Sequence, residues 1–320
     1  MIVCIVNNLY CLLLFMLMKK EDAFKNTLYF FDDDIPQTIV KQFPNSVHFI
    51  TPKSNIGKFF FLVKLRFYKY KYKNLRYAEI YGQDNLLITS PLIGGRKMAI
   101  LEDGMMNYTY KPVKIPYSRV RRILGGPLWG QNPLGYSDSI SKIFLTGLST
   151  IPDGIKNKVE IVNLKDLWDG CSVEIRKQIL TVFGVNKSIL DRFRPVKCIL
   201  LTQPLSEDGV ISEKEKIELY KQLINNEIVA IKPHPREKTN YKSFFPSIEI
   251  LPSSLPFELL SLNDITFEKV KTLFSTAALS VPGNPEIHFM GTDVCPALVA
   301  KWGKITYREG RLVREDNLNR

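Results

Sequence analysis

Histidine is scarce in this chain, and its cysteines are not grouped. The 320 residues include three histidines and five cysteines. The cysteines are scattered, odd in number and never spaced as CxxC. This pattern argues against a disulfide framework or a zinc site, and it indicates a reducing compartment.

A hydrophobic stretch long enough to span a membrane is missing from the N-terminus. The uninterrupted apolar run Leu9–Met18 is far shorter than the roughly 20 residues that a transmembrane helix needs. Neither a basic leader region nor a small-residue cleavage site accompanies it. We therefore expect Met1–Val6 to form a buried strand and Leu9–Lys20 a buried helix, with Asn7 and Asn8 as turn and cap. The sequence predicts no signal peptide and no transmembrane helix, and a signal anchor is the alternative interpretation.

Acidic residues are outnumbered, so the formal net charge is +12. Much of the excess lies in Lys58–Tyr77, "KFFFLVKLRFYKYKYKNLRY", which interleaves basic and aromatic residues. Such a segment suits an amphipathic helix whose basic side chains lie over aromatic packing, or contact with an anionic membrane surface. Nucleic acid is a weaker alternative, because no recognised nucleic-acid motif accompanies the charge. We expect no nucleic-acid partner.

What the sequence does contain is a regular alternation of short apolar runs with helical stretches. In the first half, helical stretches separate apolar runs at 1–6, 26–31, 46–51, 77–81 and 97–104, and the pattern restarts at 196–204. Such alternation implies parallel sheets with helices on both faces. Because 320 residues exceed the usual size of one core, we expect an α/β chain of two Rossmann-like domains, residues 1–195 and 196–320, facing a central cleft.

The stretch between the two alternating regions is less regular. Residues 123–138, "ILGGPLWGQNPLGYSD", are rich in glycine, proline and tryptophan. We interpret them as a functional loop or an interdomain piece.

Ligands bind beyond the carboxyl ends of the strands in open α/β sheets, and four such ends here carry reactive residue types. They are Glu102-Asp103-Gly104, residues 204–209, Pro233-His234-Pro235 and Ser275-Thr276. A carboxylate at 102–103 or at 207–208 suits a base or a hydroxyl-binding group, and it equally suits a helix cap or a solvated turn. Two hydroxyls at a strand-to-helix junction suit a phosphate, and they equally suit an ordinary N-cap.

His234 lies in "VAIKPHPRE" between Pro233 and Pro235. The prolines restrict the backbone on both sides, so the imidazole is presented with little freedom. Lys232 and Arg236 favour an anion nearby, and a histidine can protonate a leaving group near neutral pH. The alternative is a histidine packed at the end of a strand. We interpret the other two histidines, His48 and His288, as structural.

The three carboxylates Asp32–Asp34 are compatible with a metal site of the Asp-x-Asp type. Pro36 marks a helix start directly after them, so they also suit a cap that complements the helix dipole. No histidine or further carboxylate lies close in sequence. We expect no metal.

Taken together, these motifs resemble those of bacterial sialyltransferases: EDG after a first-half strand, HP after a second-half strand, and a downstream Ser/Thr pair. The order "ILLTQP…EIVAIKPHPRE…LPSSLPFELL…LFSTAALS" most resembles glycosyltransferase family 52, the lipooligosaccharide and polysaccharide α-2,3-sialyltransferases. The resemblance spans roughly residues 1–295 and is specific in 197–280. It implies a GT-B fold of two Rossmann-like domains and CMP-N-acetylneuraminic acid (CMP-Neu5Ac) as donor.

The resemblance also implies roles for individual residues. His234 matches the histidine that protonates or hydrogen-bonds the departing CMP phosphate, and Ser275 and Thr276 match the hydroxyl pair that holds this phosphate. Glu258 in "LPFELL" matches a glutamate that binds the ribose. Pro233 and Pro235 would shape the cytidine pocket, with Lys232 and Gly104 as further donor-binding residues.

The base is left open between three carboxylates. An aspartate just after the "ILL…P" strand has this role in the nearest relatives and points to Asp208, although the longer "PLSEDG" also allows Glu207. In more distant sialyltransferases the base is the aspartate of the first-half EDG, which is Asp103 here. We favour Asp208, with Asp103 second.

The activity implied is an inverting, metal-independent and cofactor-free transfer of N-acetylneuraminic acid from CMP-Neu5Ac to a terminal galactose of a bacterial surface glycan, in α-2,3 linkage. The partners would be CMP-sialic acid, a lipid-linked galactose-terminated acceptor and a second copy of the chain. The location would be cytoplasmic, peripheral at the inner face of the plasma membrane, with residues 58–77 near anionic lipid. The alternatives are another transferase with a CMP or CDP donor, such as one moving glycerol or ribitol phosphate, and a non-catalytic basic protein of the membrane surface.

Overall fold

The computed structural model describes residues 1–71, 77–94, 96–104, 106–115, 126, 128–224, 229–281, 283–308 and 311–315. The chain divides into two compact units, residues 1–183 and 184–320. This division lies before the boundary expected after residue 195, so helix α10 (Lys187–Phe193) belongs to the second unit. Each unit is built on a parallel sheet, which confirms the α/β class predicted from the alternating pattern.

The sheet of the first unit has seven strands in the order β3-β2-β1-β4-β5-β6-β7, all parallel. The central strand β1, "IVCIV", is buried on both faces, as expected of a parallel strand covered by helices. The strand order reverses between β1 and β4, which makes their carboxyl ends the switch point of this sheet. The strands are β1 (Ile2–Val6), β2 (Thr27–Phe31), β3 (Ser46–His48), β4 (Glu79–Gly82), β5 (Met98–Leu101), β6 (Ile140–Leu145) and β7 (Val159–Ile161).

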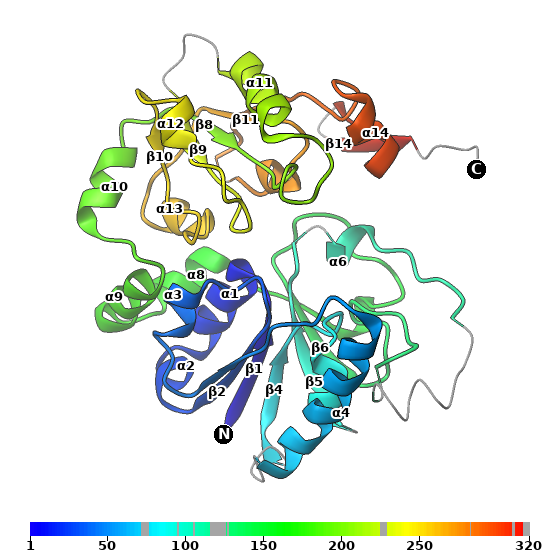
Figure 1. The fold of residues 1–320 in the computed structure, drawn as a ribbon. Coiled ribbons are helices and arrows are strands. Elements are labelled where there is room, and N and C mark those ends of the chain that lie inside the picture. The colour runs from blue at the N-terminus through cyan, green and yellow to red at the C-terminus, as the bar shows by residue number, and fades with distance from the viewer. Residues whose placement is uncertain are drawn as a thin grey trace. The chain divides into compact units, whose positions relative to one another are not determined.

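Helices cover both faces of this sheet, and Figure 1 shows α1 and α4 on opposite sides of it. Asn8 caps α1 by accepting the backbone N–H of Cys11 at 2.8 Å, as predicted, and most of α1 is buried. In the described part of the chain, no helix combines the length and the apolar character that a membrane crossing requires. The helices are α1 (Leu9–Lys19), α2 (Glu21–Lys25), α3 (Gln37–Val40), α4 (Asn55–Lys71), α5 (Thr89–Ile93), α6 (Met106–Thr109), α8 (Leu164–Asp169) and α9 (Val173–Val182), with a 3-10 turn η2 (Lys156–Lys158).

The second unit has a five-stranded parallel sheet in the order β10-β9-β8-β11-β12. Its switch point lies between β8 and β11. An antiparallel hairpin, β13 with β14, follows the last helix and was not expected from the sequence. The elements are β8 (Cys198–Leu201), α11 (Glu213–Leu223), β9 (Val229–Lys232), α12 (Tyr241–Phe244), β10 (Glu249–Ile250), α13 (Glu258–Leu262), β11 (Lys269–Thr272), η3 (Thr276–Ser280), β12 (Glu286–Phe289), α14 (Pro296–Trp302), β13 (Lys304–Arg308) and β14 (Arg311–Glu315).

Candidate active site

Three neighbouring strands of the second sheet bring the predicted donor-site residues to one edge. β9 leads into Pro233-His234-Pro235, β11 leads into Ser275, and β8 lies between them. Neighbouring strands are about 4.8 Å apart, so the ends of β9 and β11 are roughly 10 Å from each other. His234 and Ser275 therefore flank the switch point of this sheet, where open α/β folds bind ligands.

His234 is held in one orientation and one tautomer. The backbone N–H of Arg236 donates to Nδ1 of His234 at 3.2 Å, so the ring proton is assigned to Nε2. Burial, together with the charges of Arg236 and Lys232, lowers the pKa of His234 to about 4, against the opposing effect of Asp208 and Glu207. At neutral pH this imidazole is uncharged and offers one N–H donor.

A buried lysine and a buried glutamate fix the loop that carries His234. Glu237 accepts hydrogen bonds from the backbone N–H of His234 at 2.7 Å, from the Tyr241 hydroxyl at 2.6 Å and from the Thr202 hydroxyl. Lys216 of α11, whose side chain is 0% exposed, lies 3.2 Å from the same carboxylate. The histidine is thus positioned by an ion pair inside the unit.

Lys216 also fixes the loop after β8. Its Nζ atom lies 3.0 Å from Glu207, and the backbone N–H of Lys238 donates to the other oxygen of Glu207 at 2.7 Å. Although burial opposes the charged form, these hydrogen bonds lower the pKa of Glu207 to about 2. Glu207 is consequently an anchor rather than a proton acceptor near neutral pH.

Asp208 is the outward-facing acid of the same loop. Arg236 holds it in a two-pronged ion pair, with guanidinium-to-carboxylate distances of 2.7 and 3.3 Å. This pair ties the loop of Asp208 to the loop of His234, so the two sequence-predicted catalytic residues share one edge of the sheet.

Lys232 is buried directly before Pro233. Its Nζ atom donates to the carbonyl oxygens of Pro233 at 2.7 Å and Ser253 at 3.1 Å. Burial lowers the pKa of Lys232 to about 8, while the carboxylates of Glu258 and Glu237 act in the opposite direction. The lysine therefore contributes a positive field at this edge, and Glu258, at the start of α13, lies within its electrostatic range.

Ser275 is the cap residue of η3, but its side chain makes no capping hydrogen bond. Its backbone N–H donates to the Thr272 hydroxyl at 3.0 Å. Ser275 thus stands at the cap position, but its hydroxyl does not cap the helix as the N-cap interpretation requires. Thr276 opens η3, and its side chain lies outside the described part of the chain.

The predicted site residues of the first unit follow β5, and Asp103 reaches the neighbouring switch point through Asn8 after β1 and Asn85 after β4. Glu102 is fully buried and accepts four hydrogen bonds, from the hydroxyls of Tyr10, Thr146 and Tyr108 and from the backbone N–H of Thr146. Asp103 faces outward, where Asn8 donates to one oxygen at 2.6 Å and Asn85 to the other at 3.0 Å.

The two Glu-Asp-Gly tripeptides share one design. In each, the glutamate points inward to buried donors and the aspartate points outward, in contact with side chains from other loops. The glycine then turns the chain with positive φ, 59° at Gly104 and 66° at Gly209, a conformation that other residues rarely adopt. The two tripeptides therefore share the same side-chain orientation and the same turn, as well as the same sequence.

The family model of glycosyltransferase family 52 matches residues 15–297. The chain belongs to this family. It is also 35% identical over 316 residues to an uncharacterised protein of Haemophilus influenzae, with 95% of this chain and 99% of that protein covered. The enzyme is therefore a glycosyltransferase, as the sequence motifs predicted.

Solved structures of bacterial sialyltransferases resemble this glycosyltransferase in fold. The α-2,3-sialyltransferase of Photobacterium phosphoreum has a TM-score of 0.59 at 13% identity, over 90% of this chain and 89% of that one. A Photobacterium 2,6-sialyltransferase, solved with the donor product CMP and the acceptor lactose, has a TM-score of 0.58 at 14% identity, over 90% and 71%. The GT-B domain of the Photobacterium damselae sialyltransferase has a TM-score of 0.54 at 12% identity, over 91% and 90%. The GT-B expectation is confirmed.

Sequence reasoning missed the residues that position the catalytic candidates of this glycosyltransferase. Glu237 and Lys216 carry no motif of their own, and they meet only in the folded chain. One signal was available, because Lys216 shares a helical face with the buried Tyr220 and Leu223. A lysine on the apolar face of a helix indicates a buried ionic partner.

Three aspartates considered as metal ligands have other contacts. Asp33 accepts the backbone N–H of Thr51 at 3.0 Å, and Asp32 accepts the Thr51 hydroxyl at 3.1 Å. Pro36 is the residue before α3, so the carboxylates brace the segment after β3 and are not the cap of that helix. Asp34 makes other contacts of its own.

Proposed function

We propose that this glycosyltransferase is a sialyltransferase that moves N-acetylneuraminic acid from CMP-Neu5Ac to a galactose hydroxyl, with inversion and without a metal. The observation that carries the proposal is His234, a neutral N–H donor held in one orientation near two cations at the carboxyl edge of the second sheet, beside its switch point. The family membership and the sialyltransferase fold support the same chemistry.

The leaving group in this reaction is the CMP phosphate. The bond between C2 of the sugar and the phosphate oxygen breaks, and negative charge develops on that oxygen. His234 Nε2–H donates to it, while Lys232 and Arg236 supply positive charge and Ser275 a hydroxyl. Fixed donors and charges of this kind stabilise a developing anion without a metal ion.

The other half of the reaction needs a base. The acceptor hydroxyl oxygen forms the new bond to C2, and its proton passes to a carboxylate. We assign this role to Asp208, with Asp103 as the alternative, since both face outward from a turn at the carboxyl end of a parallel strand. Glu258 at the start of α13 would bind the ribose, with Pro233 and Pro235 shaping the cytidine pocket.

Incubation of the purified enzyme with CMP-Neu5Ac and lactose is expected to release CMP and yield sialyllactose in the presence of EDTA. Mass spectrometry of the product and NMR of the anomeric configuration measure this outcome. Turnover of CDP-glycerol or CDP-ribitol with no reaction of CMP-Neu5Ac would overturn the proposed function, and so would the absence of any donor turnover. Asp208→Asn and Asp103→Asn in the same assay identify the base.

A membrane-surface contact is a second part of the proposal, and it is carried by α4. Its outer face exposes apolar side chains at helical spacing, with Ile56 74%, Phe60 65% and Phe67 64% exposed, and Phe59 and Val63 beside them. Exposed lysines, Lys53 and Lys64, flank this stripe. An apolar stripe with flanking cations suits an anionic lipid surface, where a lipid-linked acceptor would be presented.

Replacement of Phe60 and Phe67 by serine is expected to weaken binding to anionic phosphatidylglycerol vesicles at least tenfold, because each ring would otherwise enter the lipid interface. Vesicle sedimentation at low salt measures this binding. Val173→Ser, which removes an exposed apolar side chain from α9, is the control and should bind as the unaltered enzyme does. Equal binding of the unaltered enzyme to anionic and neutral vesicles would contradict the proposed contact.

A further inference from the structure

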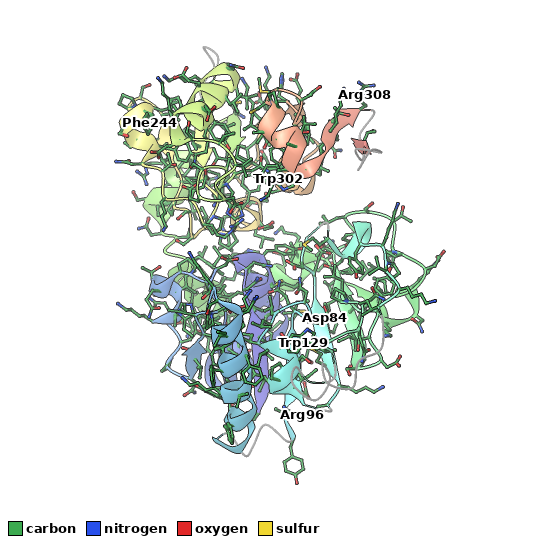
Figure 2. All side chains as sticks on the ribbon, turned by 45° about the vertical axis from the view of Figure 1, so that its right-hand side comes forward. Asp84, Arg96, Trp129, Phe244, Trp302 and Arg308 are labelled. Atoms are coloured by element: carbon green, nitrogen blue, oxygen red, sulfur yellow. The ribbon has the colours of Figure 1, made fainter. Side chains whose placement is uncertain are left out.

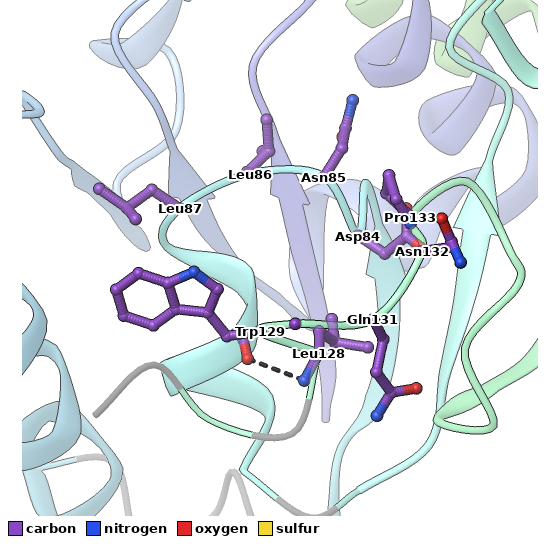
Figure 3. A pocket seen from close by; sticks show the side chains of 11 residues that line it. Asp84, Asn85, Leu86, Leu87, Leu128, Trp129, Gln131, Asn132 and Pro133 are labelled. Atoms are coloured by element: carbon purple, nitrogen blue, oxygen red, sulfur yellow. Dashed lines mark hydrogen bonds between the residues drawn. The ribbon is translucent and has the colours of Figure 1, made fainter. Parts of the chain in front are cut away.

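The first unit contains a pocket of about 280 Å³ that none of the catalytic candidates lines. Its walls are two loops, residues 84–87 after β4 and residues 128–133, together with Ser90 of α5. Figure 2 places Asp84 and Trp129 near each other in this unit, and Figure 3 shows the pocket from close by. The second loop falls in the glycine- and tryptophan-rich stretch 123–138, which the sequence analysis interpreted as a functional loop or an interdomain piece.

Hydrogen bonds fix the second loop. Asp84 accepts the backbone N–H groups of Leu134 at 2.7 Å and Gly135 at 3.0 Å, and the Ser90 hydroxyl accepts that of Leu128 at 3.0 Å. Leu134 adopts φ of 61°, a left-handed conformation that a non-glycine residue keeps only where its surroundings impose it. A side chain at Gly135 would collide with Ile143, 2.2 Å from the Cβ position. The pocket is therefore shaped before any ligand arrives.

The lining chemistry favours a neutral sugar. Trp129 presents its indole, with 36% of the residue exposed, and Figure 3 shows it on the same side of the pocket as Leu87. Asn85, in the same loop as Leu87, and Gln131, in the loop of Trp129, are amide residues among those that line the pocket. No lysine or arginine is among the described residues that line the pocket, whereas the carboxylate of Asp84 is. Among these described residues a phosphate finds no cationic partner, whereas a pyranose ring can stack its apolar face on the indole and bond its hydroxyls to amide groups.

The size and position agree with this chemistry. A volume of about 280 Å³ is at the low end of small-molecule sites, which suits one sugar ring and not a nucleotide sugar. Asn85, in the pocket wall, donates to Asp103 at 3.0 Å, so the pocket adjoins the outward acid that follows β5.

From these observations we infer that the pocket between residues 84–87 and 128–133 is the subsite for the terminal sugar of a neutral glycan acceptor, stacked on Trp129. This inference rests on the proposed function, since it names where the acceptor of that reaction binds. It assigns acceptor affinity to the first unit and leaves donor binding to the edge that carries His234.

The test compares Trp129→Ala with the unaltered enzyme, with lactose as the acceptor. We expect the KM for lactose to rise at least tenfold, because covering the exposed indole with a sugar ring contributes over 1.4 kcal/mol, about the free energy of a tenfold change. The KM for CMP-Neu5Ac and the slow donor hydrolysis without acceptor should stay unchanged. Trp129→Phe should restore most of the affinity. Equal KM values for lactose in both enzymes would overturn the inference.

A binding readout separates this inference from the proposed function. In an NMR titration, lactose should shift the indole N–H signal that Trp129→Ala removes, and CMP should not. This shift is measurable even if the enzyme fails to use CMP-Neu5Ac, in which case the proposed function falls and the sugar subsite stands. A signal that responds to CMP and not to lactose would make the pocket a nucleotide site and would overturn the inference.

Discussion

Replacement of His234 by alanine is expected to lower kcat by about 10²–10⁴-fold, the range for loss of a positioned proton donor. The reason is the geometry at the edge of the second sheet, where Arg236 fixes the Nε2–H tautomer and Glu237 fixes the backbone. His234→Gln, which keeps an N–H donor, should lose less than His234→Ala. Steady-state kinetics with CMP-Neu5Ac and lactose measure both variants.

The lowered pKa of His234 adds a pH signature. Because the pKa of this group is about 4 in the folded enzyme and 6.5 is its ordinary value, the unfolded chain binds the proton more readily between these values. The folded state therefore loses stability as the pH falls from 6.5 toward 4, and His234→Ala should flatten this dependence. The pH profile of kcat/KM, which reports the free enzyme, should show no inflection near 6.5 from this residue.

His288 provides the matched control, since it lies on β12 with its ring 2.8 Å from Glu286 and about 43% of its side chain exposed. His288→Ala should keep full activity. An activity of His234→Ala within a factor of three of the unaltered enzyme would contradict the assigned role. An imidazole signal of His234 that titrates near 6.5 would contradict the neutral-donor mechanism.

Replacement of Lys216 by methionine is expected to reduce the free energy of unfolding by about 3–5 kcal/mol, the usual effect of removing one partner from a buried ion pair. Lys216 is 0% exposed and lies within 3.2 Å of both Glu207 and Glu237, so its loss removes the ion-pair partner that these two carboxylates share. Methionine keeps the length and the apolar stem, so the effect isolates the charge. Urea denaturation followed by circular dichroism measures the change.

Lys221, five residues along the same helix, is the control because it pairs with Glu218 on the exposed face. Lys221→Met should change stability by no more than about 0.5 kcal/mol. If Lys216→Met fails to fold, the double variant Lys216→Met with Glu237→Gln should recover part of the loss, since the second change removes one stranded charge. Equal stabilities of Lys216→Met and Lys221→Met would refute the buried pair.

The fold was predictable where hydrophobic patterning is strong. The strands β1 and β8 are continuous apolar runs, and α1 begins at a clear cap, so periodicity alone locates them. The strand β7, "VEI", is three residues long and half exposed, and the hairpin strand β14, "RLVRE", is mostly charged. Such segments are strands because a neighbouring strand pairs with them, which local pattern does not reveal.

The candidate site likewise contains residues that the sequence reveals and residues that only the folded chain reveals. His234 was recognisable because two prolines and two cations surround it in sequence, and Asp103 and Asp208 because each stands before a glycine at a strand end. The partners that orient them come from distant positions, such as Asn8 for Asp103. Pairings of this kind depend on which loops the folded sheet brings together, and a single sequence carries no local trace of them.

In the two Glu-Asp-Gly turns the glutamate anchors the turn from inside and the aspartate contacts side chains outside it. The contacts of each turn therefore depend on the order of the two acids as well as on their charge. An aspartate in place of Glu102 or Glu207 would be one methylene too short to reach the donors that the glutamate contacts. A glutamate in place of Asp103 or Asp208 would carry its carboxylate past Asn85 or Arg236. Exchanging the two acids would keep charge and composition while dismantling the turn. An exchange between Glu and Asp keeps the charge, but at each of these four positions it would place the carboxylate out of reach of the partners that it contacts.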